Sequence, residues 1–146
     1  MSIATLKLPI IAAVVLAASS LTALQLFRGR VAPVPGAFAP AQRLPEALAQ
    51  SATSGKPVLA FATADWCGPC QAFKRGALAH PKVAEWITAN TIPVYIDIDT
   101  HAADARQLAV YSIPALVLIR PDGSRPSRFE GNRSAEDLLA FLTATR

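Results

Sequence analysis

The two cysteines of the chain, Cys67 and Cys70, lie in the stretch TADWCGPCQ, residues 63–71, with one glycine and one proline between them. Thiols at this spacing can close a small disulfide ring, and a thiolate is the nucleophile in disulfide exchange. Three kinds of chemistry are open to such a pair. It can be a structural disulfide, half of a metal site, or a dithiol that cycles between reduced and oxidised forms.

The first two kinds of chemistry fit the sequence poorly. A structural disulfide across so short a loop restrains the unfolded chain little and therefore stabilises a fold inefficiently. A zinc site needs about four ligands, and His80 and His101 are the only histidines that could join the cysteines. Covalent haem is disfavoured because Gln71, not histidine, follows Cys70. We expect a redox dithiol with no bound metal and no cofactor.

The elements beside the dithiol predict different roles for the two thiols. Residues 58–63 read as a buried strand, and residues 68–79 as a helix with Pro69 in its first turn, where a missing N–H is tolerated. Cys67 precedes this helix, where unpaired N–H groups and the helix dipole stabilise a thiolate. We therefore predict Cys67 as the attacking sulfur and Cys70, one helical turn on, as the resolving thiol.

The remaining elements predict the fold class. Strands are expected at 92–99, 115–120 and 125–130, with a tight turn at 121–124, and helices at 41–54, 82–90, 102–110 and 134–143. Ser134 and Asp137 stand at capping-box spacing at the start of the last helix. This order of elements indicates an α/β fold with a mixed central sheet and helices on both faces.

The N-terminal segment is apolar enough to suggest a membrane anchor. Residues 8–27 are uncharged and lie between Lys7 and Arg28. As a helix they would span about 30 Å, close to the thickness of the bilayer hydrocarbon. We expect a short tail at 1–7 and a transmembrane anchor at 8–27. The alternative is a signal peptide, cleaved near residue 20, which would leave a secreted domain.

Residues 28–40 follow as a Pro-rich linker, and VAPVPGAFAP at 31–40 predicts an extended spacer. The domain is expected at 41–146, on the periplasmic or extracytoplasmic side of the membrane. Its charge argues against nucleic-acid binding. Residues 41–146 carry 11 basic and 10 acidic side chains, with no dense basic cluster to neutralise phosphates.

A family resemblance joins these observations. WCGPC between a strand and a helix, the isolated pair Ile113–Pro114 before another strand, and the hairpin and terminal helix resemble the thioredoxin family over residues 41–146. The runs HPKVAEWI, IPVYIDID and YSIPALVLIRPDGS are most similar to membrane-tethered members, including the C-terminal domain of the transmembrane disulfide reductases of bacterial envelopes. The resemblance implies a thioredoxin-like three-layer sandwich.

The resemblance also implies a set of substrate-binding residues. Pro114 is expected to have a cis peptide bond and to pack against the dithiol, so that Ile113 offers its backbone N–H and C=O to an extended substrate. Trp66 is expected to form an apolar wall beside Cys67, with Asp65 facing solvent. Gly131 would let the substrate approach closely. The implied set is Trp66, Gly68, Pro69, Ile113, Pro114 and Gly131.

The chain departs from the family at one pair of positions. Many thioredoxins carry a buried aspartate six residues before the first cysteine and a lysine on the next strand, and the aspartate helps the resolving thiol to lose its proton. Those places are occupied here by Phe61 and Tyr95. The joint loss is physically consistent, because one buried charge left alone is costly. We expect Cys70 to lose its proton to water or to a substrate group.

The Gly-Pro pair between the cysteines is typical of the family's reductants, so the resemblance favours reduction of protein disulfides. The implied partners are disulfide-containing substrate proteins and a thiol protein that donates electrons, with cytochrome c maturation or disulfide repair as possible settings. Two alternatives stay open. One is a non-catalytic module that binds a peptide beside Trp66 and Ile113, and the other is metal delivery through the two thiolates.

Overall fold

The computed structural model describes residues 13–20, 31–39, 42–122, 124 and 126–145. The chain divides into two units, Met1–Val31 and Ala32–Arg146. In the first unit, residues 13–20 are helical and their side chains are exposed. Within the described residues, no helix combines the length and the apolar character needed to cross a bilayer. The rest of the predicted anchor, at 8–12 and 21–27, and the predicted tail at 1–7 lie outside the described residues.

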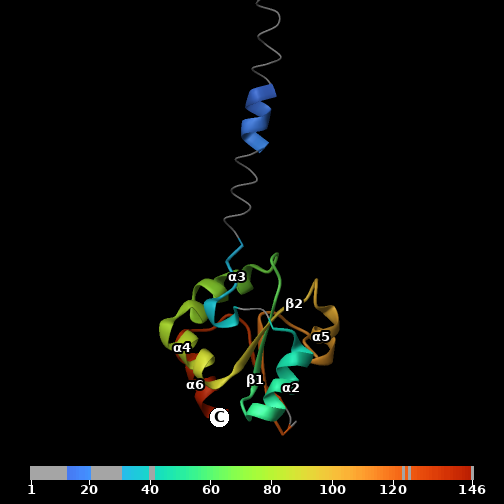
Figure 1. Cartoon of the computed structure of the whole chain (residues 1–146). Helices are drawn as coiled ribbons and strands as arrows, with labels where there is room; N and C mark the ends of the chain where they lie inside the picture. The colour runs from blue at the N-terminus through green and yellow to red at the C-terminus, as the bar shows by residue number, and fades with distance from the viewer. Residues whose placement is uncertain (1–12, 21–30, 40–41, 123, 125, 146) are drawn as a thin grey trace, which may run out of the picture. The chain divides into compact units, whose positions relative to one another are not determined.

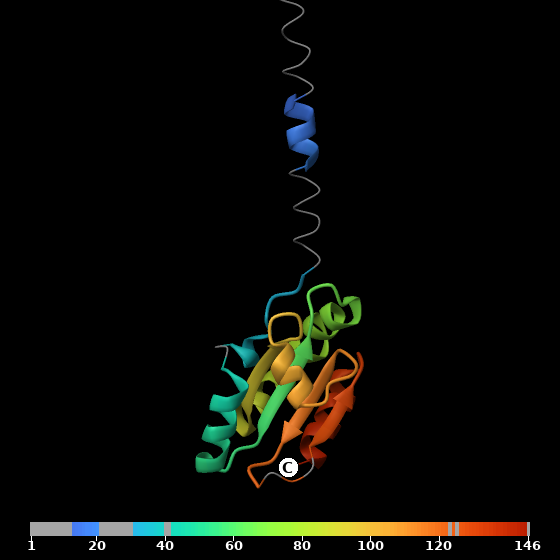
Figure 2. The same cartoon turned by 90° about the vertical axis from the view of Figure 1, so that its right-hand side faces the viewer.

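The second unit is built on a mixed sheet, as the order of elements predicts. Its strands are β1 (Val58–Thr63), β2 (Ile92–Asp97), β3 (Ala115–Ile119) and β4 (Ser127–Glu130), in the spatial order β2-β1-β3-β4. Strand β1 runs parallel to β2 and antiparallel to β3, and β4 returns antiparallel to β3. Figure 2 shows β3, in orange, beside β4, in red, which forms one edge of the sheet.

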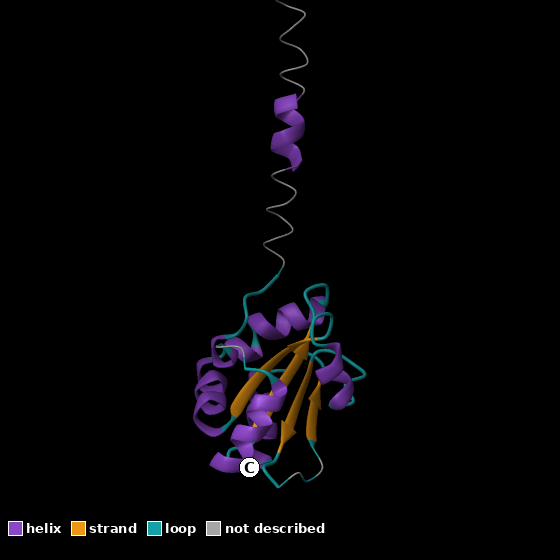
Figure 3. Ribbon diagram, turned by 45° about the vertical axis from the view of Figure 1, so that its right-hand side comes forward, coloured by secondary structure: helices purple, strands orange, loops and turns teal. Residues whose placement is uncertain are grey.

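Helices cover both faces of this sheet (Figures 1 and 3). They are α2 (Leu44–Ser54), α3 (Gly68–Arg75), α4 (Pro81–Asn90), α5 (Ala102–Gln107) and α6 (Ala135–Ala144), with the short 3₁₀ helices η1 (Gly36–Phe38) and η2 (Ala77–Ala79). Figure 1 shows α4 and α6 on one side of the strands and α2 and α5 on the other. The expected arrangement of helices on both faces is confirmed.

The core explains why β1 is apolar at nearly every position. Successive side chains of a strand point to opposite faces. Leu59 and Phe61 pack with residues of α3, α4 and α6, whereas Val58 and Ala60 pack with residues of α2 and α5. Both faces are covered, so all six residues of the strand are buried. The dithiol follows this central strand after a short turn at residues 64–66.

The helix after the dithiol is shorter than the sequence predicts. The expected helix at 68–79 ends at Arg75, and η2 follows after Gly76. A Cβ atom at Gly76 would lie 3.1 Å from the carbonyl oxygen of Ala72, so the chain turns where a larger residue would be crowded. At the other end of the chain the predicted cap is confirmed, since the Asp137 N–H donates to Ser134 Oγ at 3.1 Å.

The structure corrects the predicted linker. Residues from Ala32 onward belong to the compact unit, which therefore begins before the expected boundary at residue 41. Phe38, at the end of η1, is fully buried, and its ring centroid lies 5.6 Å from that of Phe61. Removal of an aromatic ring from water is favourable, and an extended spacer would leave the Phe38 ring exposed to water. The apolar residues of this Pro-rich stretch thus make it part of the domain.

Candidate active site

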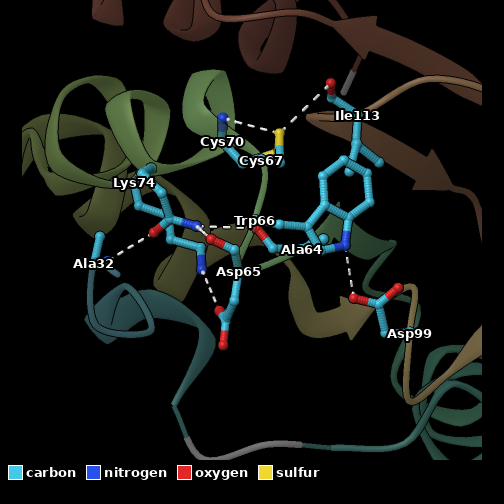
Figure 4. Close-up of a disulfide and its surroundings, with 10 residues drawn as sticks. Ala32, Ala64, Asp65, Trp66, Cys67, Cys70, Lys74, Asp99 and Ile113 are labelled. Carbon is cyan, nitrogen blue, oxygen red and sulfur yellow. Dashed lines mark hydrogen bonds and ion pairs between the residues drawn. A yellow bond between two sulfur atoms is a disulfide. The ribbon is translucent and has the colours of Figure 1, made fainter. Parts of the chain in front are cut away.

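The two cysteines form a disulfide at the start of α3 (Figure 4). The S–S distance is 2.09 Å and the Cα atoms are 5.2 Å apart. Cys67 is the N-cap residue of α3, and the Cys70 N–H donates to Cys67 Sγ at 3.2 Å. This backbone contact directs a partial positive charge at the sulfur that we predict as the nucleophile. Gly68 and Pro69 form the exposed first turn between the two sulfurs.

The predicted proline lies beside the dithiol. The Ile113–Pro114 peptide bond is cis, as the resemblance implies. The carbonyl oxygen of Ile113 lies 3.9 Å from Cys67 Sγ, and Pro114 is buried. Gly131 has a φ of 83°, a conformation that favours glycine, and its N–H donates to the Pro114 carbonyl at 2.9 Å. Ile113 therefore lies beside Cys67, and Gly131 is hydrogen-bonded to Pro114, the residue after Ile113.

Trp66, expected to form an apolar wall beside Cys67, also has a hydrogen-bonded polar edge. Its side chain is 69% exposed, and its indole Nε1–H donates to Asp99 Oδ2 at 2.8 Å (Figure 4). It lines a hollow of about 190 Å³ together with Ile98, Ala105, Val110, Tyr111, Ser112 and Ile113. The ring thus presents an apolar face while its polar edge is held by a carboxylate. The hollow joins Trp66 to Ile113 across the site.

An aromatic cluster occupies the place of the family's buried acid and base. Phe61 is fully buried and is the register partner of Tyr95 across the β1–β2 pair. Their ring centroids lie 5.8 Å apart, and Phe73 from α3 adds a third ring 5.9 Å from Phe61. Burial, and then the carboxylates of Asp65 and Asp97, raise the pKa of Tyr95 to about 12. Neither Phe61 nor neutral Tyr95 can act as a base toward Cys70 at neutral pH.

The sequence interpretation missed Lys74, a buried cation on α3. Its side chain is 1% exposed, and its Nζ lies 3.8 Å from Asp65 Oδ1 and 5.2 Å from the centroid of the Tyr95 ring. Burial lowers the pKa of Lys74, and the carboxylates of Asp65 and Asp97 oppose that shift. The available signal was its spacing, because a residue four positions after Cys70 lies on the same helix face. Asp65 is largely exposed, as predicted, but it is also paired.

The interpretation also missed Gln71, which it used only to exclude haem. This side chain is buried, and its amide Nε2 donates to the carbonyl oxygens of Ala64 at 3.0 Å and Asp65 at 3.2 Å. Its Oε1 accepts the Ala32 N–H at 2.7 Å. No local signal in the sequence links residue 71 to residue 32.

Among the described residues, no group of three or more His, Cys, Asp or Glu side chains could hold a metal ion.

Comparison with known proteins places the chain in a family. A family model described as thioredoxin-like matches residues 39–121. A thioredoxin of Mycobacterium bovis is 35% identical over 91 residues, which cover 62% of this chain and 75% of the relative. A thioredoxin-like protein of Synechocystis is 38% identical over 91 residues, which cover 62% of this chain and 83% of that protein.

Two solved structures share the fold at lower identity. A thioredoxin from Thermus thermophilus superposes with a TM-score of 0.62 at 24% identity. The match covers 70% of this chain and 82% of that thioredoxin chain. A DsbH oxidoreductase superposes with a TM-score of 0.62 at 21% identity and covers 79% of this chain and 86% of its own. The family match and the disulfide between Cys67 and Cys70 point the same way. The chain therefore belongs to the thioredoxin-like family, and with this dithiol it is a thiol–disulfide oxidoreductase.

Proposed function

We propose that this protein is a membrane-tethered reductase of protein disulfides. The observation that carries the proposal is the Cys67–Cys70 pair at the start of α3, with the Ile113 carbonyl 3.9 Å from Cys67 Sγ. The Gly-Pro pair between the cysteines supports the direction toward reduction, because the family's reductants commonly carry it. The described disulfide is the oxidised state that one round of reduction would leave behind.

The reaction runs in two exchange steps. The Cys67 thiolate attacks one sulfur of a substrate disulfide, forms a mixed disulfide, and releases the other substrate sulfur as a thiolate that takes a proton from water. Cys70 then loses its proton and attacks Cys67 Sγ. The bond between Cys67 and the substrate breaks, and the second substrate sulfur leaves. Two electrons pass to the substrate, and a donor thiol protein must return two electrons to the Cys67–Cys70 disulfide.

The surroundings of Cys67 suit an extended substrate chain. The backbone of Ile113 lies next to the sulfur, and neither its N–H nor its C=O takes part in a backbone hydrogen bond with the described residues. A substrate strand can therefore pair with it, as extended peptides pair with exposed sheet edges. Trp66 would offer its exposed face to the same chain, while Gly68 and Pro69 leave the approach to Cys67 free of large side chains. Gly131 holds the other side of Pro114.

Cys70 has no dedicated internal base in this proposal. The place of the family's acid is filled by Phe61, so the Cys70 proton passes to water or to a substrate group. We expect resolution of the mixed disulfide near neutral pH to be slower than in thioredoxins that keep the buried acid. Stopped-flow measurement of that step checks this point. A rate equal to that of such a thioredoxin would count against it.

Reduction of insulin disulfides with dithiothreitol as electron donor tests the function. We expect the full chain to accelerate the reaction and Cys67→Ser to return it to the uncatalysed rate. Cys70→Ser should keep the first step and accumulate a mixed disulfide with the substrate, seen on non-reducing gels. Failure of the wild-type chain to accelerate the reaction, or activity that survives Cys67→Ser, would favour the peptide-binding alternative instead.

The midpoint potential of the Cys67–Cys70 pair tests the direction. Equilibration with glutathione buffers should give a value of about −270 mV, as in thioredoxin, whereas a value of about −120 mV would make the protein an oxidant. The membrane part of the proposal is supported by the uncharged run at residues 8–27 and by the resemblance to membrane-tethered reductases. We propose that the dithiol works on the extracytoplasmic side and receives its electrons from a thiol carrier in the membrane.

A further inference from the structure

Gln71 is the residue directly after the dithiol, and it joins three separate parts of the chain. Its side chain is buried, yet each of its polar atoms has a backbone partner. Two partners are the carbonyls of Ala64 and Asp65, in the turn that leads into Cys67. The third is the N–H of Ala32, the first residue of the compact unit. Figure 4 labels Ala32, Ala64 and Asp65, whose backbone groups make these contacts, in the surroundings of the disulfide.

The chemistry of these three groups selects a primary amide. Two carbonyl oxygens need donors and one N–H needs an acceptor, and a glutamine supplies both from one planar group. A lysine could not accept the Ala32 N–H. A glutamate would place negative charge against two carbonyl oxygens. An apolar side chain would leave the Ala32 N–H and the Asp65 carbonyl without this partner and the Ala64 carbonyl with the Cys67 N–H alone, which is costly.

The contact with Ala32 is part of a larger attachment of residues 32–38 to the domain. Residues 32–36 border a hollow of about 440 Å³ whose other wall is made by Lys74, Arg75, Leu78, Ala79 and Ala84 of the α3–α4 region. Two residues after this stretch, Phe38 is fully buried against Phe61. The segment is therefore held at both ends, by Gln71 at Ala32 and by the core at Phe38.

We propose that Gln71, held by the Ala32 N–H, is a positioning residue that fixes the turn at 64–66 against α3 and so promotes closure of the Cys67–Cys70 disulfide. Cys67 follows this turn and Cys70 precedes Gln71 on the helix. A side chain that ties the turn to the helix holds the two sulfurs within reach of each other, which raises their effective concentration. The proposal rests on the dithiol exchange proposed above and adds a role for the packed residues that begin at Ala32.

The first test replaces Gln71 by methionine in the full chain. Methionine has a similar length and helix propensity, but it cannot donate to the carbonyls and its thioether is only a weak acceptor for the N–H. We expect the equilibrium constant for disulfide formation to fall about five- to tenfold, which corresponds to a rise of the midpoint potential by about 20–30 mV. Resolution of the mixed disulfide by Cys70 should slow by a similar factor.

The second test removes only the hydrogen bond between the Ala32 N–H and the Gln71 side chain. Ala32→Pro deletes the N–H donor, and Val34→Pro is the matched control because the Val34 N–H has no hydrogen-bond partner in the described chain. We expect Ala32→Pro to shift the potential in the same direction as Gln71→Met, and Val34→Pro to leave it unchanged. In the double variant Ala32→Pro/Gln71→Met, the shift should be smaller than the sum of the two single shifts, because both act through one contact.

The outcomes separate this inference from a purely structural role. Urea unfolding of the oxidised and reduced forms should show that Gln71→Met destabilises the oxidised form more than the reduced form. Equal destabilisation of both forms with an unchanged potential would overturn the inference. So would additive shifts in the double variant, or an equal shift in Val34→Pro. Insulin reduction by the wild-type chain distinguishes these results from failure of the proposed function, which would appear as no activity before any substitution.

Discussion

Lys74 on α3 and Tyr95 on β2 lie against each other, and burial shifts their pKa values in opposite directions. The pKa of Tyr95 is raised from 10.0 to about 12, and that of Lys74 is lowered from 10.5. Both shifts favour the neutral form, because burial penalises charge. The ammonium also interacts with the Tyr95 ring at 5.2 Å. The two positions that hold a charged pair in many relatives are Phe61 and Tyr95 here, and a cation from α3 lies against the Tyr95 ring.

These shifts predict how stability depends on pH. Between pH 10 and 12 the unfolded chain has lost the Tyr95 proton while the native chain keeps it, so the native state binds more protons. The free energy of unfolding therefore falls as pH rises through this window. Lys74 acts in the opposite sense below pH 10.5, where the unfolded state binds more protons and stability rises with pH.

Tyr95→Phe isolates the tyrosine contribution. We expect the fall in unfolding free energy between pH 10 and 11 to be smaller in the variant than in the wild-type chain. The difference should stay below about 1.4 kcal/mol per pH unit, the limit for a single proton. Urea unfolding of the oxidised proteins checks this result. Tyr111→Phe is the control, because Tyr111 is 93% exposed, and an equal effect there would contradict the assignment to Tyr95.

At the scale of single residues, the sequence predicted the reacting residues better than the residues that hold them in place. Cys67, Cys70 and the cis bond at Pro114 could be inferred because each belongs to a local motif with a known partner. Gln71 could not, and Lys74 had only its helical spacing from Cys70 as a signal, because the importance of both comes from contacts made in the fold. Those contacts are with Ala32 and with Tyr95 of β2, which lie far away in the sequence. Phe61 was identified as a departure from the family, but its contacts with Phe38 and Phe73 were visible only in the fold.

At the scale of elements, the order of strands and helices followed from hydrophobic periodicity, because each strand buries one or two faces of predictable residues. The errors lie at element ends and in the N-terminal segment. The helix after the dithiol was predicted through Gly76, where the chain turns. The stretch at 31–40 was read as a spacer because of its prolines. Prolines exclude a regular helix or strand, but they do not prevent packing against a core.

Phe38 provides a test of that attachment. Phe38→Ala should cost about 3–5 kcal/mol of unfolding free energy, because it leaves a cavity beside Phe61 in the core. Val34→Ala in the same segment should change it by no more than about 0.5 kcal/mol, since Val34 is 45% exposed. Urea unfolding of both variants measures the difference. A small effect at Phe38 would mean that η1 is a spacer after all.

At the scale of the whole molecule, the open question is how the dithiol domain is tethered. If residues 8–27 span a bilayer, the full chain expressed in bacteria should remain with the membrane fraction after carbonate extraction. Leu16→Arg places a charge near the middle of the run. It should make the free energy of membrane insertion less favourable by about 2.5–3.5 kcal/mol. Leu16→Ala is the matched control and should leave the chain in the membrane fraction. Recovery of the wild-type chain in the soluble fraction would refute the anchor.

The setting of Trp66 gives the protein an optical signal of its own. The chain has two tryptophans, of which Trp66 directly precedes Cys67 and is exposed, while Trp86 lies half-buried on α4. A disulfide quenches the fluorescence of a neighbouring indole, so emission from Trp66 should rise when the dithiol is reduced. Trp86→Phe would leave Trp66 as the single emitter. Reduction, mixed-disulfide formation and resolution could then be followed in real time without any attached dye.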